Sequence, residues 1–221
     1  MFWWGDYSVS TEHMVYLNLK NGIPAPRSDS AEMNGLTIAE KIDGQIFIDT
    51  WGLIFPGDPA NAAEDATITA SVSHDKNGLY GAAFISACIA QTFVTNDIDE
   101  LIDIGLSFIP SDSTYAAVVR AVSKFHAQNP DIWRSCLEYL QQNWGYDRYG
   151  GNCHIIPNAG VCVMLLLYGR NYPRAVEFST MSGWDTDCNA GNVGTIMGVA
   201  CGLVGIPQHY REPIYDTIAL L

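Results

Sequence analysis

The spacing of the apolar residues is the feature that most restricts the fold of this chain. Apolar side chains recur three and four positions apart through much of the sequence, as at Trp133, Cys136, Leu137 and Leu140. This is the period of an amphipathic helix with one face in a core. Ile46-Phe47-Ile48 is the only segment that we consider for a strand, and because it is too short for periodicity to decide, we assign it to a loop. The pattern predicts an all-α fold.

Two Asx-Pro pairs mark expected helix starts. Asp58-Pro59 and Asn129-Pro130 each combine a side-chain acceptor at the N-cap with a proline at the first helical position. Together with the apolar spacing, they predict helices over 59–73, 80–88, 98–106, 115–125, 130–140, 157–168, 173–181, 188–204 and 212–220. Because no proline- or serine-rich linker and no repeat divides the chain, we expect residues 1–221 to form a single multi-helix domain that resembles an orthogonal bundle.

Charge and cysteine usage narrow the class of partner and the compartment. With 24 acidic and 11 basic residues, the net charge is −13, so the field repels nucleic acid and favours cations. The longest clean apolar run, 161–168, is too short to cross a bilayer, and residues 1–10 carry neither a basic nor an apolar signal region. The six cysteines include no Cys-x-x-Cys pair. We therefore expect a cytoplasmic protein with reduced thiols and neither a membrane nor a nucleic acid as partner.

The segment 182–191 carries the strongest chemical signal. Asp185 and Asp187 lie two residues apart in a turn that Gly183 begins and that opens a helix, so both carboxylates can converge in front of that helix. Oxygen ligands of this kind suit a hard cation such as Mg²⁺. The alternative, that either aspartate only caps the helix, stays open from position alone. Because a buried carboxylate pair repels itself, a metal is its natural partner.

Two other Asp-x-Asp sites are less compatible with the sequence. An EF-hand loop that begins at Asp185 needs glycine and glutamate where Ala190 and Ile196 stand, so that interpretation fails. A sugar-nucleotide transferase also holds a metal with Asp-x-Asp, but its motif normally follows the strands of an α/β sheet. Helical patterns flank the motif in this chain.

Glycines recur along the helix that follows the aspartates. Gly191, Gly194, Gly198 and Gly202 each cost roughly 1 kcal/mol of helix propensity relative to alanine. The last three lie four residues apart, which indicates a groove for close backbone approach. We therefore expect this helix to be buried against its neighbours at the centre of the protein, with the two aspartates at its buried amino end.

Four ordered stretches of the sequence resemble the ADP-ribosylglycohydrolase family. Pro56-Gly57-Asp58-Pro59 precedes Ser73-His74-Asp75-Lys76-Asn77-Gly78-Leu79-Tyr80-Gly81, and His154-Ile155-Ile156-Pro157-Asn158 precedes Gly183-Trp184-Asp185-Thr186-Asp187-Cys188-Asn189. The resemblance covers roughly residues 35–215, and the last stretch is its most specific part. It implies an all-α domain of the ADP-ribosylglycohydrolase type.

The resemblance also implies an activity and a set of site residues. The family holds two Mg²⁺ ions and cleaves the N- or O-glycosidic bond between ADP-ribose and a protein side chain or small acceptor. Asp185 and Asp187 would be metal ligands and catalytic carboxylates, with Asp187 orienting or deprotonating the attacking water. Cys188 stands where the family normally has a threonine ligand, and a thiol is a poor ligand for Mg²⁺. The resemblance also implies substrate-binding positions, which are His74, Asn77, Tyr80, His154, Trp184 and Asn189.

A larger departure from the family pattern is a missing motif. The first metal motif, Thr-Asp-Asp-Thr or close to it, is not found, and the nearest candidates, Asp6 and Thr11-Glu12, do not match it. Either the chain lacks the amino-terminal part of the domain, or half of the metal site has been lost. The alternative function is therefore a catalytically inactive domain that binds ADP-ribose or a nucleotide, or that acts as a structural or interaction domain. The expected partners are an ADP-ribose-containing small molecule, an ADP-ribosylated protein and a second copy of the chain.

Other interpretations stay open for several of these residues. His74 suits an ordinary capping histidine between helices as well as a ligand contact. Trp184 suits core packing as well as stacking on adenine or ribose. Tyr146 and Tyr149 lie in a loop with Gly150 and Gly151 that either covers a pocket or only connects two helices.

Overall fold

A computed structural model describes residues 10–151, 153–215 and 217 of the chain. Its helices are α1 Thr11–Lys20, α2 Ala31–Asn34, α3 Leu36–Ala39, α4 Asp43–Ile46, α5 Asp49–Ile54, α6 Pro59–Ala70, α7 Asn77–Gln91, α8 Ile98–Ser107, α9 Thr114–Gln128, α10 Trp133–Trp144, α11 Ile155–Gly169, α12 Tyr172–Ser182, α13 Thr186–Gly205 and α14 Gln208–Arg211, with 3₁₀ helices at Arg27–Asp29 and Glu212–Ile214. Within these residues no β-strand forms, and one isolated bridge pairs Lys41 with His154. The all-α prediction is confirmed.

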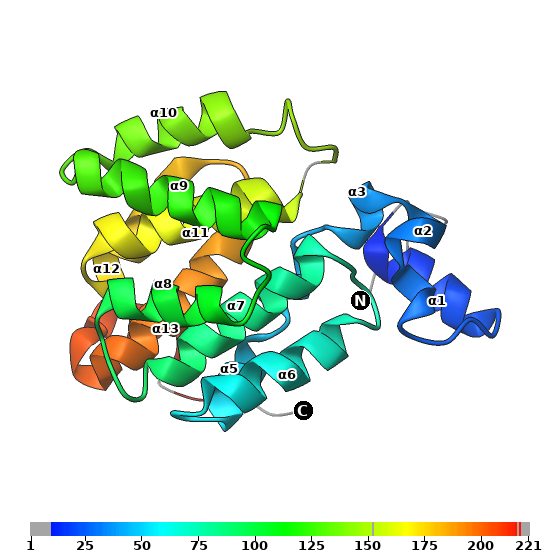
Figure 1. Cartoon of the computed structure of the whole chain (residues 1–221). Coiled ribbons are helices and arrows are strands. Elements are labelled where there is room, and N and C mark those ends of the chain that lie inside the picture. Colours follow the sequence, from blue (N-terminus) through cyan, green and yellow to red (C-terminus); the bar gives the residue numbers. More distant parts are fainter. Residues whose placement is uncertain (1–9, 152, 216, 218–221) are drawn as a thin grey trace.

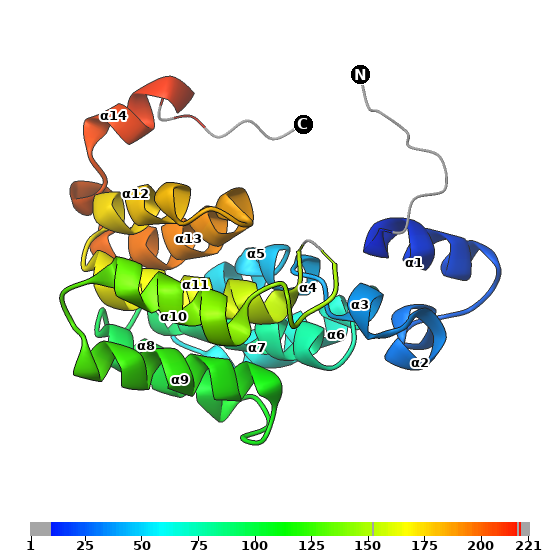
Figure 2. The ribbon, with the colours of Figure 1, turned by 90° about the horizontal axis from the view of Figure 1, so that it is seen from above.

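Helix α11 is the centre of the bundle. Its 15 residues are all buried, because α9 and α10 pack against one side and α12 and α13 against another (Figures 1 and 2). A helix that is apolar on every face is stable in water only when neighbours surround it. A Cβ at Gly160 would lie 2.6 Å from the Leu140 side chain, so glycine here permits the close approach of α10.

Helix α7 joins the remaining helices to this centre. It packs against α4, α5, α6 and α8 as well as α9, α11 and α13. A Cβ at Gly52 in α5 would lie only 2.4 Å from the Ile89 Cβ in α7, so these two helices cross at nearly backbone contact. The short helices α1, α2 and α3 lie together at one end of the molecule (Figures 1 and 2).

Most of the predicted helices occur within a few residues of their expected bounds, but two boundaries were wrong. Helix α10 begins at Trp133, not at Pro130, because Asn129 instead ends α9 and donates its backbone N–H to the carbonyls of Phe125 and His126. The helix expected over 212–220 is a single 3₁₀ turn that ends where Tyr215 adopts a left-handed conformation, with φ at 51°. The positions 216 and 218–220 lie outside the described residues.

The amino-terminal third contains helices that the periodicity did not predict. Several are only four residues long, too short for an apolar stripe to repeat. Ile46-Phe47-Ile48, assigned to a loop, in fact contributes the last residue of α4 and the two residues that lead into α5.

The expectation that the glycines of α13 face a packed groove was wrong. The buried residues of this helix are Asn189, Asn192, Val193, Ile196 and Met197, whose spacing marks its inner face. A Cβ at Gly194 or Gly202 would meet no atom of another element within 4 Å, and a Cβ at Gly198 would lie 3.7 Å from the Tyr172 ring, an ordinary contact that does not require glycine. The helix also breaks at Gly202, where φ is 60° and ψ is −179°, and α14 then projects beyond α12 and α13 (Figure 2).

Helix α13 is also the one helix among the described residues that is long and apolar enough to cross a membrane. One such helix is weak evidence for a membrane span, since core helices of soluble proteins meet the same criterion. Its buried face here carries Asn189 and Asn192, whose side chains bond to neighbouring helices.

Candidate metal and substrate site

The turn between α12 and α13 shapes the front of α13. Gly183 and Trp184 adopt positive φ values of 71° and 59°, a conformation that a tryptophan rarely takes. Asp185 follows at the N-cap position of α13, but its side chain accepts no backbone N–H there. The turn therefore places Asp185 at the helix end without using its carboxylate as a cap.

Asp185 is a buried carboxylate with an unused oxygen. The residue is 9% exposed, and its Oδ2 atom is buried without a hydrogen-bond partner. Burial raises its pKa, and the neighbouring Asp187 carboxylate raises it further, while contacts with the Cys188 and Cys153 thiols act in the opposite direction. Neither aspartate pairs with a lysine or arginine in the part of the chain that the structure describes. An oxygen that no protein donor satisfies is open to a ligand or an ion.

Asp187 and Cys188 complete a close cluster with Asp185. One ligand atom from each of the three lies within 4.8 Å of the others, and Asp187 is exposed. The pKa of the Cys188 thiol is raised by burial and by the negative charge of Asp185 and Asp187. Cys188 therefore stays protonated at neutral pH, in a form that does not ligate metal ions well. The two carboxylates are the hard donors of this cluster.

One further acidic residue, Asp43, acts on the same cluster, and sequence analysis did not identify it. Asp43, in the first turn of α4, has its pKa raised to about 6 by burial, with further contributions from the charges of Glu12 and Asp185 and an opposing one from Lys41. Glu12 lies in the first turn of α1. Only the packing of α4 against α13 brings Asp43 close to Asp185, and no local motif marks this pair.

His74 is enclosed between α6 and α4, where both of its ring nitrogens are occupied. The Gly44 backbone N–H donates to Nε2 at 2.9 Å, and Nδ1 contacts Ser73 Oγ at 2.8 Å. The ring is 1% exposed, and burial, with Lys41 nearby, lowers its pKa to about 4. The neutral ring therefore accepts at Nε2 and donates from Nδ1. This arrangement corresponds to the structural interpretation of His74 and leaves no ring nitrogen for a substrate.

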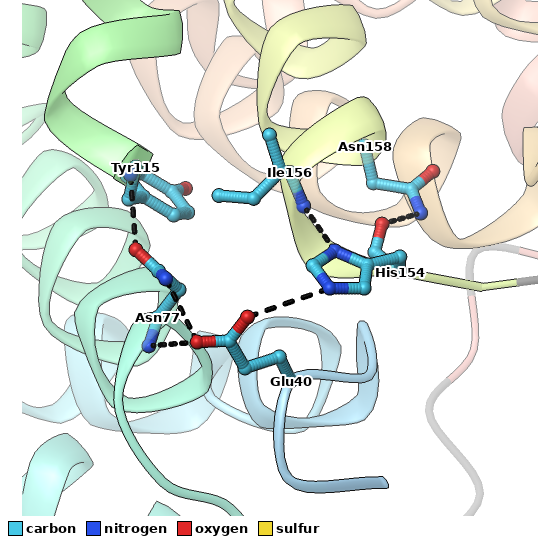
Figure 3. A network of polar contacts seen from close by, with 6 residues as sticks. All are labelled: Glu40, Asn77, Tyr115, His154, Ile156 and Asn158. Atoms are coloured by element: carbon cyan, nitrogen blue, oxygen red, sulfur yellow. Dashed lines mark hydrogen bonds and ion pairs between the residues drawn. The ribbon is translucent and has the colours of Figure 1, made fainter. Parts of the chain in front are cut away.

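His154 and Asn77 also belong to a buried network, which Figure 3 shows. His154 is the N-cap of α11, and its Nδ1 accepts the Ile156 backbone N–H at 3.2 Å. Its Nε2 lies 3.4 Å from Oε2 of Glu40, a residue that sequence analysis had not singled out. Asn77 donates its backbone N–H and Nδ2 to Oε1 of Glu40, at 3.3 and 2.8 Å. Asn77 Oδ1 accepts the Tyr115 backbone N–H at 3.0 Å (Figure 3).

This network gathers three helix amino ends around one carboxylate. Glu40 caps α7, Asn77 caps α9 and His154 caps α11, so each satisfies a backbone N–H that has no partner within its own helix. Burial alone would raise the pKa of Glu40, but the hydrogen bonds from His154 and Asn77 hold that pKa below its usual value. The partial positive charge of the three helix ends also favours a negative group here.

Asn189 lies in the core and connects α13 to α11. Its Nδ2 donates to Asn158 Oδ1 at 2.9 Å, and the Cys162 thiol lies 3.3 Å from its Oδ1. Asn158 in turn donates to the Tyr146 hydroxyl at 3.0 Å, and the Tyr146 ring meets Trp184 edge to face with centroids 5.1 Å apart. The aromatic loop is thus packed onto the turn that carries Asp185. Trp184 remains half-buried.

A second amide layer fastens α13 to α4 and α5. Asn192 Nδ2 donates to Asp49 Oδ1 at 2.9 Å, and its Oδ1 accepts from Gln45 Nε2 at 3.0 Å. Gln45 Oε1 accepts the Tyr115 hydroxyl at 2.8 Å. Tyr80, one turn along α7 from Asn77, is half-buried and packs against the core. The site as a whole thus combines the cluster of Asp185 and Asp187, which suits a cation, with the half-buried ring of Trp184, the residue before Asp185.

The family model for ADP-ribosylglycohydrolase matches residues 3–221. No curated protein and no solved structure matches the chain.

Proposed function

Because the chain belongs to the ADP-ribosylglycohydrolase family, we propose that it is a Mg²⁺-dependent hydrolase that cleaves the glycosidic bond of an ADP-ribosylated side chain or a related ADP-ribose conjugate. The observation that supports this proposal most is the unpartnered Oδ2 of buried Asp185, which lies beside Asp187 at the amino end of α13. A carboxylate in that position is costly unless something binds it.

The donor set fits a magnesium ion in part. Asp185 and Asp187 supply the oxygen ligands that Mg²⁺ prefers, and Mg²⁺ commonly takes only one or two carboxylates and keeps several waters. Cys188 does not fit, because sulfur is a soft ligand and Mg²⁺ prefers hard oxygen donors. Asp43 adds negative charge close to the two ligands. When bound, the ion supplies positive charge that holds ribose hydroxyls and makes water more acidic.

The residues of the chain have separate parts in this chemistry. Asp187, which is exposed, accepts a proton from the attacking water or orients it. Asp185, which is buried, would hold the ion, and its negative charge would stabilise the positive character that develops at C1 of the ribose. Trp184 presents a half-buried indole against which adenine or ribose stacks.

The test combines ligand-induced stabilisation with a hydrolysis assay. We expect Mg²⁺ and ADP-ribose together to raise the melting temperature by several degrees, since a ligand that binds only the folded state stabilises it. We also expect release of ADP-ribose from an ADP-ribosylated peptide, and loss of that release in Asp187→Asn with folding nearly intact. Retained activity in Asp187→Asn would remove the catalytic assignment.

A second candidate function is binding without hydrolysis. It is favoured by the absence of a Thr-Asp-Asp-Thr motif from these 221 residues. Stabilisation by ADP-ribose with no hydrolysis of any ADP-ribosylated acceptor would select it over the hydrolase. If neither ligand changes the melting temperature, both proposals fail.

A further inference from the structure

We propose that Glu40 and His154 form a positioning pair that holds the Asp185 turn in place. The contact between their side chains, 3.4 Å long and buried on both sides, lies at the amino end of α11. The residue before His154, Cys153, contacts Asp185 through its thiol. Its relevance to metal and substrate binding rests on the proposed function. Its effect on the turn is a property of the protein alone and is tested separately.

The pair fixes one protonation form of His154. Because Nδ1 accepts the Ile156 backbone N–H, the ring proton must lie on Nε2, which then donates to Glu40 (Figure 3). The two contacts therefore depend on each other. A neutral group in place of the Glu40 carboxylate would weaken the bond to Nε2, and the opposite tautomer of His154 would lose the cap of α11.

The backbone supports the same contact. The Ile42 N–H donates to the Cys153 carbonyl at 2.8 Å, and the Ile155 N–H donates to the Glu40 carbonyl at 2.9 Å. The segment before α4 and the segment before α11 are thus joined by two backbone bonds and one side-chain pair. The Tyr149 ring packs against His154 at a centroid distance of 5.0 Å, which encloses the pair further.

Two routes of hydrogen bonds and ring packing lead from His154 to the Asp185 turn. The His154 carbonyl accepts Asn158 Nδ2 at 2.8 Å, and Asn158 Oδ1 accepts Asn189 Nδ2. The backbone N–H of Asn189 donates to the Asp185 carbonyl at 3.2 Å, which completes the first route. In the second route, Asn158 Nδ2 donates to the Tyr146 hydroxyl, and the Tyr146 ring packs against Trp184.

These routes converge on a turn whose conformation needs support. Trp184 adopts a positive φ of 59°, and a non-glycine residue keeps such a conformation only where its surroundings over-determine it. The Tyr146 ring packs against Trp184, and the Asn189 N–H bonds to the carbonyl of the next residue, Asp185. Contiguous side-chain networks of this kind can couple one end of a helix to a neighbouring turn.

The experiment measures hydrogen exchange in the metal-free protein. Two variants break the pair: Glu40→Gln, which preserves shape but removes the charge, and His154→Asn, which keeps a good N-cap residue but no longer reaches Glu40. The matched control is Asp97→Ala, which removes the two backbone bonds that cap α8 and has no part in the network. Exchange is compared between peptides that cover 183–192 and 98–107.

We expect both pair variants to exchange about tenfold faster than wild type over 183–192, the size of effect expected for one lost hydrogen bond. We expect Asp97→Ala to accelerate exchange over 98–107 and to leave 183–192 unchanged. Because His154→Asn retains the cap of α11, it tests the pair even if Glu40→Gln does not fold. Unchanged exchange over 183–192 in the pair variants overturns the proposal, as does an increase of the same size in Asp97→Ala.

A magnesium titration of melting temperature at constant ionic strength then separates the two proposals. We expect the pair variants to need about tenfold more Mg²⁺ than wild type for the same shift, as loss of one hydrogen bond in the supporting network predicts. If wild type shows no magnesium response while the exchange result holds, the positioning pair stands and the metal-dependent function fails. If wild type responds to Mg²⁺ but exchange does not change, the function stands and the pair is only a structural cap.

Discussion

At the scale of single residues, Asp185 combines burial with an oxygen atom that no donor satisfies. Burial and the charge of Asp187 both raise its pKa, so the folded protein is strained when Asp185 is ionised. Sites that bind a cation commonly carry such a cost in the unbound state. An aspartate that only caps a helix would have a lowered pKa, because backbone N–H groups donate to its ionised carboxylate.

Substitution of Asp185 by asparagine should therefore stabilise the protein without Mg²⁺. We expect the free energy of unfolding in urea to rise by about 1 kcal/mol, since the neutral amide relieves repulsion and desolvation. The same variant should lose the stabilisation by Mg²⁺. A loss of stability of the size seen when a helix cap is removed would instead assign Asp185 to capping.

His74 and Asp29 should make opposite contributions to the pH dependence of stability. Burial lowers the pKa of His74 to about 4, so its contribution is complete above its unfolded pKa of 6.5 and is lost as pH falls toward 4. Burial raises the pKa of Asp29 to about 7, with further contributions from Asp75 and Glu12 against a hydrogen bond from Asn34. The contribution of Asp29 is therefore complete below pH 3.8 and is lost as pH rises toward 7.

The prediction concerns the difference between wild type and His74→Gln. Between pH 7 and pH 4, the free energy of unfolding of wild type relative to the variant should fall by roughly 3 kcal/mol, because each pKa unit is worth about 1.4 kcal/mol. Urea unfolding at several pH values measures this. The Asp29→Asn variant serves as the comparison, and its difference from wild type should change in the opposite direction. A pH-independent difference for His74→Gln would mean that His74 is not buried and neutral.

At the scale of helices, glycine has two distinct roles in this fold. Gly52 allows α5 and α7 to cross, since a Cβ there would lie 2.4 Å from the Ile89 Cβ. Gly194 in α13 has open space around the position of its Cβ and lies in regular helix. The spacing of glycines in a sequence does not distinguish these cases.

Alanine substitutions at Gly52 and Gly194 should therefore change the free energy of unfolding in opposite directions. Gly52→Ala should lower the free energy of unfolding by about 2 kcal/mol through overpacking. Gly194→Ala should raise it by about 1 kcal/mol through better helix propensity. Urea denaturation of both variants measures the contrast. If Gly194→Ala destabilises the protein as Gly52→Ala does, the glycine face of α13 is covered by another surface in solution.

At the scale of the whole molecule, the net charge of −13 opposes the compact state. The tertiary structure adds to this by bringing Asp43 within electrostatic range of both Glu12 and Asp185. Salt should screen the general repulsion, whereas a divalent cation should act at the cluster as well. The two effects are separable by experiment.

Added NaCl should raise the melting temperature, and MgCl₂ at the same ionic strength should raise it further. We expect the additional shift to be about 2–4 °C, which corresponds to about 1 kcal/mol for a domain of this size. The double variant Asp185→Asn with Asp187→Asn should keep the NaCl effect and lose the additional one. Equal shifts with both salts in wild type would mean that the cluster does not select the divalent ion.

The sequence by itself determined the helical class, most helix bounds, the Asp185–Asp187 turn and the family. These features depend on local spacing: apolar residues at helical period, caps such as Asp58 and Asp97, and a motif confined to a few consecutive residues. The roles of Asp185 and Asp187 as metal ligands stay a prediction, although the turn does place them together.

Only the tertiary structure decided which distant residues meet. Periodicity shows that a helix has a buried face but not which helix covers it, so the glycine face of α13 was assigned to the wrong side. The contact of Glu40 with His154 and the charge of Asp43 near Asp185 likewise join segments that no short motif links. Such contacts follow from the directions in which whole helices cross, and these depend on the shapes of all the packed side chains together.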